Sequence, residues 1–387
     1  MPKRTGARVN ADVLSGLTHV EVWNQSRRVG TLAQPDPRSA CLFEYDEAWM
    51  RDGFAIAPYS LELRQGVMAP PNAGIGGLHG IFADSLPGDW GQLLVERRLA
   101  ELGIDASRLG PLERLSIVGA NGPGALEYRP VFAAQREGSK QAEEDFDKLA
   151  LQCQAILDDK DADDIDRLYA RGGSSGGARP KMEIWLDGSP WFVKFPTRED
   201  GLSAGADEYR LMLLAKECGI IVPEVRLIPS EVCPGFFATK RFDRVRLSDG
   251  SLSKVYMASA AALLEKSPFD SSDYRELMAL CFDLTRDVRD CEQLYLVMCF
   301  NVLVGNQDDH LKNFSFLYDE AERAWHLSPA YDLTRVQGFL GEHATLVNGK
   351  GTAITQDDLV SVGKSGGISA RKCRELLGVV RDVTSVV

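Results

Sequence analysis

Apolar and polar residues alternate along much of the first 130 residues, and this pattern predicts β-strands. In residues 19–32, HVEVWNQSRRVGTL, two alternating runs flank the polar turn Asn-Gln-Ser at 24–26. Two such runs around a short polar turn are typical of a β-hairpin. Residues 41–45 and 54–63 are further strand candidates. The amino-terminal part is therefore expected to be rich in β-structure.

A helical period replaces this alternation in two places before residue 171. In residues 78–102, LHGIFADSLPGDWGQLLVERRLAEL, apolar positions recur every three or four residues, and Gly103 supplies a stop. The charge-rich stretch 133–171 contains AEEDFDKLALQCQAILDD, which predicts one amphipathic helix. We interpret this stretch as the join between an amino-terminal domain and the rest of the chain.

A glycine-rich loop and a second hairpin are predicted from residue 171 onward. The sequence RGGSSGGARPK leads into an apolar run at 182–186, then Asp187-Gly188, then a second run that ends at Lys194. An aspartate–glycine pair between two apolar runs is a strong signal for a tight hairpin turn.

The carboxy-terminal part is predicted to be largely helical. Residues 206–218 carry a helical apolar face, strands are expected near 224–228 and 236–242, and helices should dominate from about residue 256. Residues 292–304, EQLYLVMCFNVLV, are apolar nearly all round, so this helix should lie buried in the middle of a lobe.

Composition narrows the class of protein. With 387 residues the chain is long enough for two or three domains. Its net charge of −12 argues against an extended basic surface, so it is not expected to hold nucleic acid unaided. The eight cysteines form no CxxC pair, which favours reduced thiols over a zinc site or disulfides. With neither a signal peptide nor a membrane span evident, we expect a cytoplasmic protein that does not bind membranes.

A dense group of polar residues follows the buried helix, in GNQDDHLKNFSF at 305–316. Asp308 and Asn313 are five positions apart, the spacing of a protein-kinase catalytic loop; Asp309 does not have it. There the aspartate accepts the proton of the attacking hydroxyl, and the asparagine oxygen helps to hold Mg²⁺. Asp332 follows an apparent hairpin, as the metal-binding aspartate of a kinase does. The alternative for this stretch is a solvated turn after a core helix.

Lys194 and the glycine-rich loop at 172–178 fit the same chemistry. Glycines allow backbone N–H groups to approach phosphate closely, although such runs also occur as flexible linkers. Lys194 is charged within an apolar strand, so it must find an anion or extend to solvent. Kinases pair this lysine with a glutamate on the next helix, for which Glu208 is the candidate; a surface glutamate is the alternative. His310 and Lys312 are close enough in sequence to contact phosphate.

One further nucleotide motif is excluded. Residues 363–365 read GKS, but a Walker loop needs a glycine five residues before Gly363, and position 358 is aspartate. GKSGG is better explained as the end of a helix, with Ser369 capping the next one. The five histidines are scattered along the sequence, which disfavours a metal hydrolase.

Together these motifs resemble the HipA family of bacterial serine/threonine kinases, which are toxins of type II toxin–antitoxin systems. The resemblance covers nearly the whole chain. The first hairpin, IFADSLPGDWGQLL at 81–94 and VGANGPGALEYRP at 118–130 are similar to the family's amino-terminal domain. The kinase part is similar in SSGGARPK (174–181, phosphate loop), FVKFP (192–196, lysine strand), ATKRFDR (238–244, interlobe hinge), NQDDHLKNFS (306–315, catalytic loop) and PAYDL (329–333, metal motif).

This resemblance implies a role for each matching residue. Asp308 would be the catalytic base, and Asn313 and Asp332 would bind Mg²⁺. The ATP site would be lined by Gly176, Gly177, Ala178, Arg179, Pro180, Lys181, Lys194, Lys240, Arg241, Phe242, His310 and Lys312. Ser174, or its neighbour Ser175, matches the serine that the family autophosphorylates to silence itself. A phosphate there would bring roughly two negative charges into a loop built to hold ATP phosphates.

We therefore predict an α+β, two-lobed protein-kinase-like fold with a β-rich amino-terminal domain and a mostly helical carboxy-terminal lobe. The expected domains are residues 1–134, a small lobe at 135–244 that holds the glycine-rich loop, and a helical catalytic lobe at 245–387. The resemblance implies ATP- and Mg²⁺-dependent phosphorylation of a protein substrate, such as an aminoacyl-tRNA synthetase. It also implies a dimeric helix-turn-helix antitoxin of the HipB type, through which operator DNA would be bound.

Two other functions are compatible with the same sequence. A catalytically silent relative would act as a corepressor through antitoxin and DNA binding, although intact Asp308, Asn313, Asp332 and Lys194 disfavour it. A small-molecule kinase on a similar scaffold would phosphorylate an alcohol or an aminoglycoside and leave Ser174 unmodified. The HipA-like amino-terminal domain disfavours that second alternative.

Overall fold

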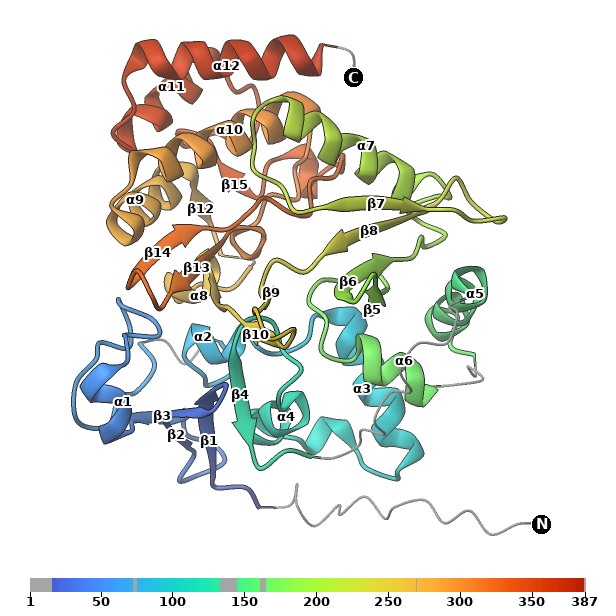
Figure 1. The fold of residues 1–387 in the computed structure, drawn as a ribbon, viewed down its shortest axis with the longest axis vertical. Coiled ribbons are helices and arrows are strands. Elements are labelled where there is room, and N and C mark those ends of the chain that lie inside the picture. Colours follow the sequence, from blue (N-terminus) through green and yellow to red (C-terminus); the bar gives the residue numbers. More distant parts are fainter. Residues whose placement is uncertain (1–15, 72–74, 133–144, 161–164, 269, 386–387) are drawn as a thin grey trace. The chain divides into compact units, whose positions relative to one another are not determined.

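The computed structural model describes residues 16–71, 75–132, 145–160, 165–268 and 270–385 (Figure 1). The chain forms two compact units, unit 1 from Met1 to Glu183 and unit 2 from Ile184 to Val387. The boundary expected at 134/135 lies outside the described residues. It and the boundary expected at 244/245 stay predictions.

Unit 1 contains an antiparallel four-stranded sheet in the order β3-β2-β1-β4. Its strands are β1 (His19–Asn24), β2 (Arg27–Ala33), β3 (Leu42–Tyr45) and β4 (Leu126–Arg129). The first hairpin is confirmed, with Val20 opposite Leu32 and a turn in which Gln25 has a φ of 54°. The strand predicted at 41–45 is also present as β3.

The strand predicted at 54–63 is wrong. This segment is irregular, with a single bridge between Ala57 and Leu61. The hydroxyl of Tyr45 donates to the Leu61 carbonyl at 2.8 Å and accepts from the Ile56 N–H at 3.1 Å. Its apolar residues Phe54, Ile56 and Leu61 are buried, and the tyrosine hydroxyl satisfies two of its main-chain groups in place of a strand ladder.

The helices of unit 1 are α1 (Glu47–Asp52), α2 (Gly80–Ala83), α3 (Asp89–Glu101), α4 (Pro111–Val118), α5 (Phe146–Leu157) and α6 (Ile165–Gly172). The helical pattern at 78–102 is confirmed as α2 and α3, which are separated at Pro87. The helix predicted around 142–159 is confirmed as α5, although residues 142–144 lie outside the described part. A core cluster of Val95, Leu99, Ile117, Phe132 and Tyr169 joins α3, α4 and α6. Residues 165–172 therefore fold with unit 1.

A second antiparallel sheet has the order β5-β6-β8-β7, and the division between the units falls within β5. Its strands are β5 (Lys181–Leu186), β6 (Ser189–Lys194), β7 (Val225–Ile228) and β8 (Phe236–Lys240). The predicted Asp187-Gly188 turn is present, with φ values of 50° and 70° as a tight hairpin turn requires. Helix α7 (Ala204–Glu217) packs on β7 and β8.

The rest of unit 2 is mainly helical, with α8 (Ala260–Leu263), α9 (Tyr274–Thr285), α10 (Val288–Val304), α11 (Gln356–Ser365) and α12 (Ala370–Thr384). Short strands interrupt it: β9 (Arg244–Arg246) pairs with β10 (Leu252–Lys254), and β12 (Ser272–Asp273) with β15 (Thr345–Leu346). Strands β11 (Tyr256–Ser259), β13 (Ser315–Asp319) and β14 (Ala324–Leu327) form a small sheet. Helix α10 is buried on most sides, as predicted, and Ser369 caps α12 by accepting from the Lys372 N–H.

All eight cysteines lie in described residues and are free thiols. Seven of them are buried, and Cys233 is partly exposed. Within the described residues, no helix combines the length and the apolar character that crossing a bilayer requires.

Candidate active site

A buried charge cluster forms where β6 ends. Lys194 is the last residue of β6 and is only 8% exposed. Its Nζ lies 2.5 Å from Oε1 of Glu208 on α7, and it also pairs with the Asp332 carboxylate. The predicted pair of Lys194 with Glu208 is therefore present. Burial by itself would lower the pKa of Lys194, but Asp332 and Glu208 outweigh it, and the pKa is raised above its ordinary value.

Asp332 is held in an uncommon backbone conformation, with a φ of 53°. A non-glycine residue in this left-handed region needs support from its surroundings. Tyr331 supplies it, because its hydroxyl donates to the Lys312 carbonyl at 2.7 Å and lies 2.6 Å from the Ser315 hydroxyl. The segment that carries Asp332 is thereby attached to the loop that carries Asp308 and Asn313.

The loop after α10 presents Asp308 to solvent. Gly305, with a φ of 76°, ends the helix, and a short 3₁₀ turn spans Leu311–Asn313. The Asn313 side-chain amide donates to the Asp308 carbonyl at 2.7 Å, which fixes its orientation. The Asp308 side chain is 58% exposed and has Nε2 of His310 at 3.8 Å.

Asp309, the next residue, has the opposite environment. Its carboxylate is buried and accepts from the Tyr274 hydroxyl at 2.9 Å, from Nδ1 of His343 at 2.8 Å and from the Thr345 N–H at 3.2 Å. The Thr345 hydroxyl also donates to the Asp309 carbonyl at 2.6 Å. Asp309 therefore anchors the loop to α9 and β15, and Asp308 is the aspartate that is accessible. Sequence reasoning missed these three partners because they lie more than thirty positions away, with no local signature.

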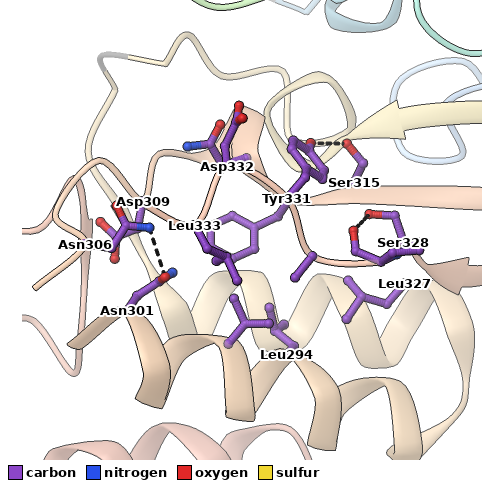
Figure 2. A pocket seen from close by; sticks show the side chains of 15 residues that line it. Leu294, Asn301, Asn306, Asp309, Ser315, Leu327, Ser328, Tyr331, Asp332 and Leu333 are labelled. Atoms are coloured by element: carbon purple, nitrogen blue, oxygen red, sulfur yellow. Dashed lines mark hydrogen bonds between the residues drawn. The ribbon is translucent and has the colours of Figure 1, made fainter. Parts of the chain in front are cut away.

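A pocket lies between this loop and α10. It is lined by Leu294, Val297, Asn301, Asn306, Asp309, Asn313, Phe314, Ser315 and residues 327–333. Figure 2 shows Asn301, Asn306 and Asp309 grouped on one side and Ser315, Ser328 and Tyr331 on the other. The Asn306 amide donates to Oδ1 of Asn301 at 3.0 Å, and the Asn301 amide donates to the Tyr274 hydroxyl at 3.1 Å. A chain of hydrogen bonds thus continues from the loop into α10.

Both predicted metal ligands line this pocket. Asn313 offers an amide oxygen, since its nitrogen is engaged by the loop, and Asp332 offers a carboxylate. Hard oxygen donors of this kind suit Mg²⁺, which usually keeps several waters and phosphate oxygens as its other ligands. No group of three or more His, Cys, Asp or Glu side chains suited to a metal occurs among the described residues. The donor set therefore fits a magnesium ion shared with a phosphate.

Of the three residues expected to form the hinge, Phe242 contacts the segment that carries Asp332, and the other two form ion pairs. Phe242 packs against Tyr331, with ring centroids 5.6 Å apart, and so contacts the segment that carries Asp332. Lys240 pairs with Glu224 at 3.2 Å. Arg241 is buried and forms two bonds to Asp243, at 2.9 and 2.6 Å. The side chains of Lys240 and Arg241 are thus engaged in ion pairs.

The glycine-rich loop lies in unit 1. Ser175 is buried, and its hydroxyl donates to the Gly172 carbonyl at 2.6 Å, whereas Ser174 is partly exposed. Residues 176–178 are exposed, and Gly177 has a φ of 79°, which favours glycine. A Cβ added at Gly177 would come within 3.0 Å of the Lys181 Nζ, so the lysine amine lies beside the loop.

Comparison with known proteins identifies the family. A family model for the HipA-like C-terminal domain matches residues 173–387, and a model for the HipA N-terminal domain matches residues 20–129. The chain belongs to the HipA family. The HipA chain in a Shewanella oneidensis complex of HipA, HipB and operator DNA superposes with a TM-score of 0.71 at 18% identity, covering 95% of this chain and 90% of that one. The predicted kinase-like α+β fold is thereby confirmed.

Two curated relatives of this HipA-family chain come from Sinorhizobium fredii. "Putative kinase Y4dM" is 26% identical over 200 residues, which are 48% of this chain and 48% of the relative. "Putative kinase Y4mE" is 32% identical over 134 residues, which are 33% of this chain and 31% of the relative. The chain thus spans about half the length of the first relative and about a third of the second.

Proposed function

We propose that this protein is an ATP- and Mg²⁺-dependent serine/threonine protein kinase and the toxin of a toxin–antitoxin pair. The observation that carries the proposal is the buried Lys194, paired with both Glu208 and Asp332. A lysine–glutamate pair on adjoining strand and helix, beside a metal-binding aspartate, is the arrangement that protein kinases use on ATP phosphates. Tyr331 attaches this cluster to the loop of Asp308 and Asn313.

The proposed mechanism assigns one task to each group. Lys194 binds the ATP phosphates. Asn313 and Asp332 would hold Mg²⁺, which would supply positive charge against those phosphates. Asp308 orients the serine or threonine hydroxyl and takes up its proton. An oxygen–phosphorus bond then forms at the γ-phosphorus as its bond to the β-phosphate oxygen breaks, which leaves ADP. Orientation and electrostatic stabilisation account for most of the acceleration in such a site.

The remaining expected nucleotide contacts form part of the same proposal. His310 and Lys312 lie within the catalytic loop, and Phe242 contacts Tyr331, the residue before Asp332. Because the side chains of Lys240 and Arg241 are engaged in ion pairs, this segment would contribute through its main chain. Residues 176–181 would contact the phosphates.

We assign self-silencing to phosphorylation of Ser174. Ser175 is buried with its hydroxyl bonded to Gly172, whereas Ser174 is partly exposed, so accessibility favours Ser174 as the acceptor. A phosphate at that position adds roughly two negative charges to a loop intended for the phosphates of ATP. Repulsion between them would lower the affinity for ATP.

The proposed partner is a dimeric helix-turn-helix antitoxin of the HipB type. The solved Shewanella relative is a HipA in complex with HipB and operator DNA, which supports this assignment. The net charge of −12 favours DNA contact mainly through the antitoxin. The proposed target is a cytoplasmic protein of translation, such as an aminoacyl-tRNA synthetase.

Mass spectrometry tests the kinase activity and the self-silencing site together. The protein is first dephosphorylated with a phosphatase, then incubated with Mg-ATP and analysed intact and as peptides. We expect one phosphate on Ser174 in the parent and none in Asp308→Asn. Asp283→Asn, which changes an exposed aspartate on α9, is the matched control and should behave as the parent.

The alternative outcome separates the two leading functions. A parent that binds ATP but transfers phosphate neither to itself nor to any added protein would overturn the kinase proposal. It would support the catalytically silent corepressor.

A further inference from the structure

The first turn of α3 and the glycine-rich loop are joined by hydrogen bonds within unit 1. The Gly88 N–H donates to the Ser175 carbonyl at 3.0 Å, and the Trp90 N–H donates to the Gly177 carbonyl at 3.4 Å. The indole N–H of Trp90 donates to the Lys181 carbonyl at 3.1 Å. We call residues 88–91 the α3 seat.

The α3 seat has no room for a side chain at Gly88 or at Gly91. A Cβ on Gly88 would lie 2.3 Å from the Gly177 nitrogen, and a Cβ on Gly91 would lie 2.8 Å from the Ser175 oxygen. Both clashes are with main-chain atoms, so neither is relieved by moving a side chain. Helix α3 also lacks a side-chain cap at Gly88. Loop carbonyls therefore satisfy N–H groups that a capping side chain would otherwise take.

The bonds to the α3 seat also set the direction of two other N–H groups. In a trans peptide the C=O and the following N–H point in opposite directions. Because the Ser175 and Gly177 carbonyls are directed at α3, the N–H groups of Gly176 and Ala178 are directed away from it. Both residues are exposed, and neither N–H has a hydrogen-bond partner within the part of the chain that the structure describes. Exposed main-chain N–H groups that lack an internal partner are available to donate to an anion.

We propose that the α3 seat is a positioning element for nucleotide binding. By holding the carbonyls of Ser175 and Gly177, it keeps the N–H groups of Gly176 and Ala178 turned outward, where they donate to phosphate oxygens. The seat is made of residues from the amino-terminal part of the chain, which lies outside the kinase motifs. This inference rests on the proposed function, because that proposal supplies ATP as the ligand.

Calorimetry with two ligands tests the α3 seat. Dissociation constants are measured on phosphatase-treated protein for a non-hydrolysable ATP analogue with Mg²⁺ and for adenosine, which lacks phosphates. For Gly88→Ala in the full chain we expect the affinity for the analogue to fall about tenfold or more, since hydrogen bonds to charged phosphate are lost. The affinity for adenosine should stay within about twofold. Gly378→Ala is the matched control, because a Cβ there meets nothing within 4 Å.

A milder variant and a second measurement cover the case in which Gly88→Ala folds poorly. Trp90→Phe keeps an aromatic ring and the main-chain bonds but removes the bond to Lys181, so the same selective loss should appear at a few-fold. Hydrogen–deuterium exchange of peptides covering 86–91 and 172–178 should be faster in Gly88→Ala than in the parent.

Each contrary outcome has one meaning. If the analogue and adenosine lose affinity equally, or if the ratio of their affinities and the exchange of both peptides are unchanged, the seat does not position the loop and this inference is overturned alone. If the dephosphorylated parent binds neither ligand, the proposed function is overturned and the inference fails with it.

Discussion

Asp308 and Asp309 are adjacent in sequence and differ completely in what surrounds them. The side chain of Asp308 is exposed and near His310, whereas that of Asp309 is buried and accepts three hydrogen bonds. The first environment suits a group that meets a substrate, and the second suits an anchor. The spacing to Asn313 had already favoured Asp308 as the base, and burial now provides a physical reason for the same choice.

Stability measurements should separate the two aspartates. Asp309→Ala leaves the buried His343 and Tyr274 without their acceptor, so we expect a loss of about 3 kcal/mol in the free energy of unfolding. Asp308→Ala should change it by about 0.5 kcal/mol or less, as is usual for an exposed position. Urea denaturation followed by circular dichroism provides the measurement. Equal losses in the two variants would contradict the anchor role of Asp309.

Among the elements, α7 has the clearest link to the chemistry. It carries Glu208, and it approaches the second sheet so closely that a Cβ on Gly205 would lie 2.5 Å from the Gly235 carbonyl oxygen and 3.0 Å from the Phe237 nitrogen. The lack of a side chain at Gly205 thus sets the distance between helix and sheet. That distance in turn determines whether Glu208 reaches Lys194.

Substituting Gly205 should therefore affect both stability and activity. In Gly205→Ala the helix must move away from β8, because both clashing atoms belong to the main chain. We expect a loss of about 2 kcal/mol in the free energy of unfolding and at least a tenfold loss of autophosphorylation. Gly378→Ala, also in a helix, should be neutral or slightly stabilising. Full activity in Gly205→Ala would show that the spacing of α7 is unimportant.

Elements with strong local signals were predicted correctly, and those that depend on distant partners were not. The Asp187-Gly188 hairpin and the uniformly apolar α10 follow from turn chemistry and periodicity. The apolar pattern at 54–63 predicts a strand although the segment is irregular, because buried segments of both kinds are apolar. Helix α6 was not distinguished within a charged stretch, although Tyr169 belongs to a core shared with α3 and α4.

In the candidate site, too, some contacts could be predicted from the sequence and others could not. The pairing of Lys194 with Glu208 could be predicted because kinases place these residues on consecutive elements. The partners of Asp309 and the α3 seat could not, because each depends on a contact between segments far apart in sequence. Gly88 and Gly91 carry no signal of their own until the loop that they touch is known.

At the scale of the whole chain, the expectation that the eight cysteines are reduced thiols can be tested. All are free, and only Cys233 is partly exposed. We expect Ellman's reagent to modify one thiol quickly in the native protein and eight after denaturation. Cys233→Ser should remove the fast reaction, and the melting temperature of the parent should not change with added reductant. Several fast thiols, or fewer than eight in denaturant, would contradict this picture.

The α3 seat also has a consequence for how this protein can evolve by exchanging parts. The two family matches, 20–129 and 173–387, suggest segments that recombination could shuffle independently. Yet Gly88 and Gly91 lie in the first segment and touch the loop that opens the second. A chimera whose amino-terminal segment comes from a relative with any side chain at these two positions would inherit a loop that no longer docks. A junction between the two matches therefore preserves function only when the donor of the amino-terminal segment has glycine at both of these positions.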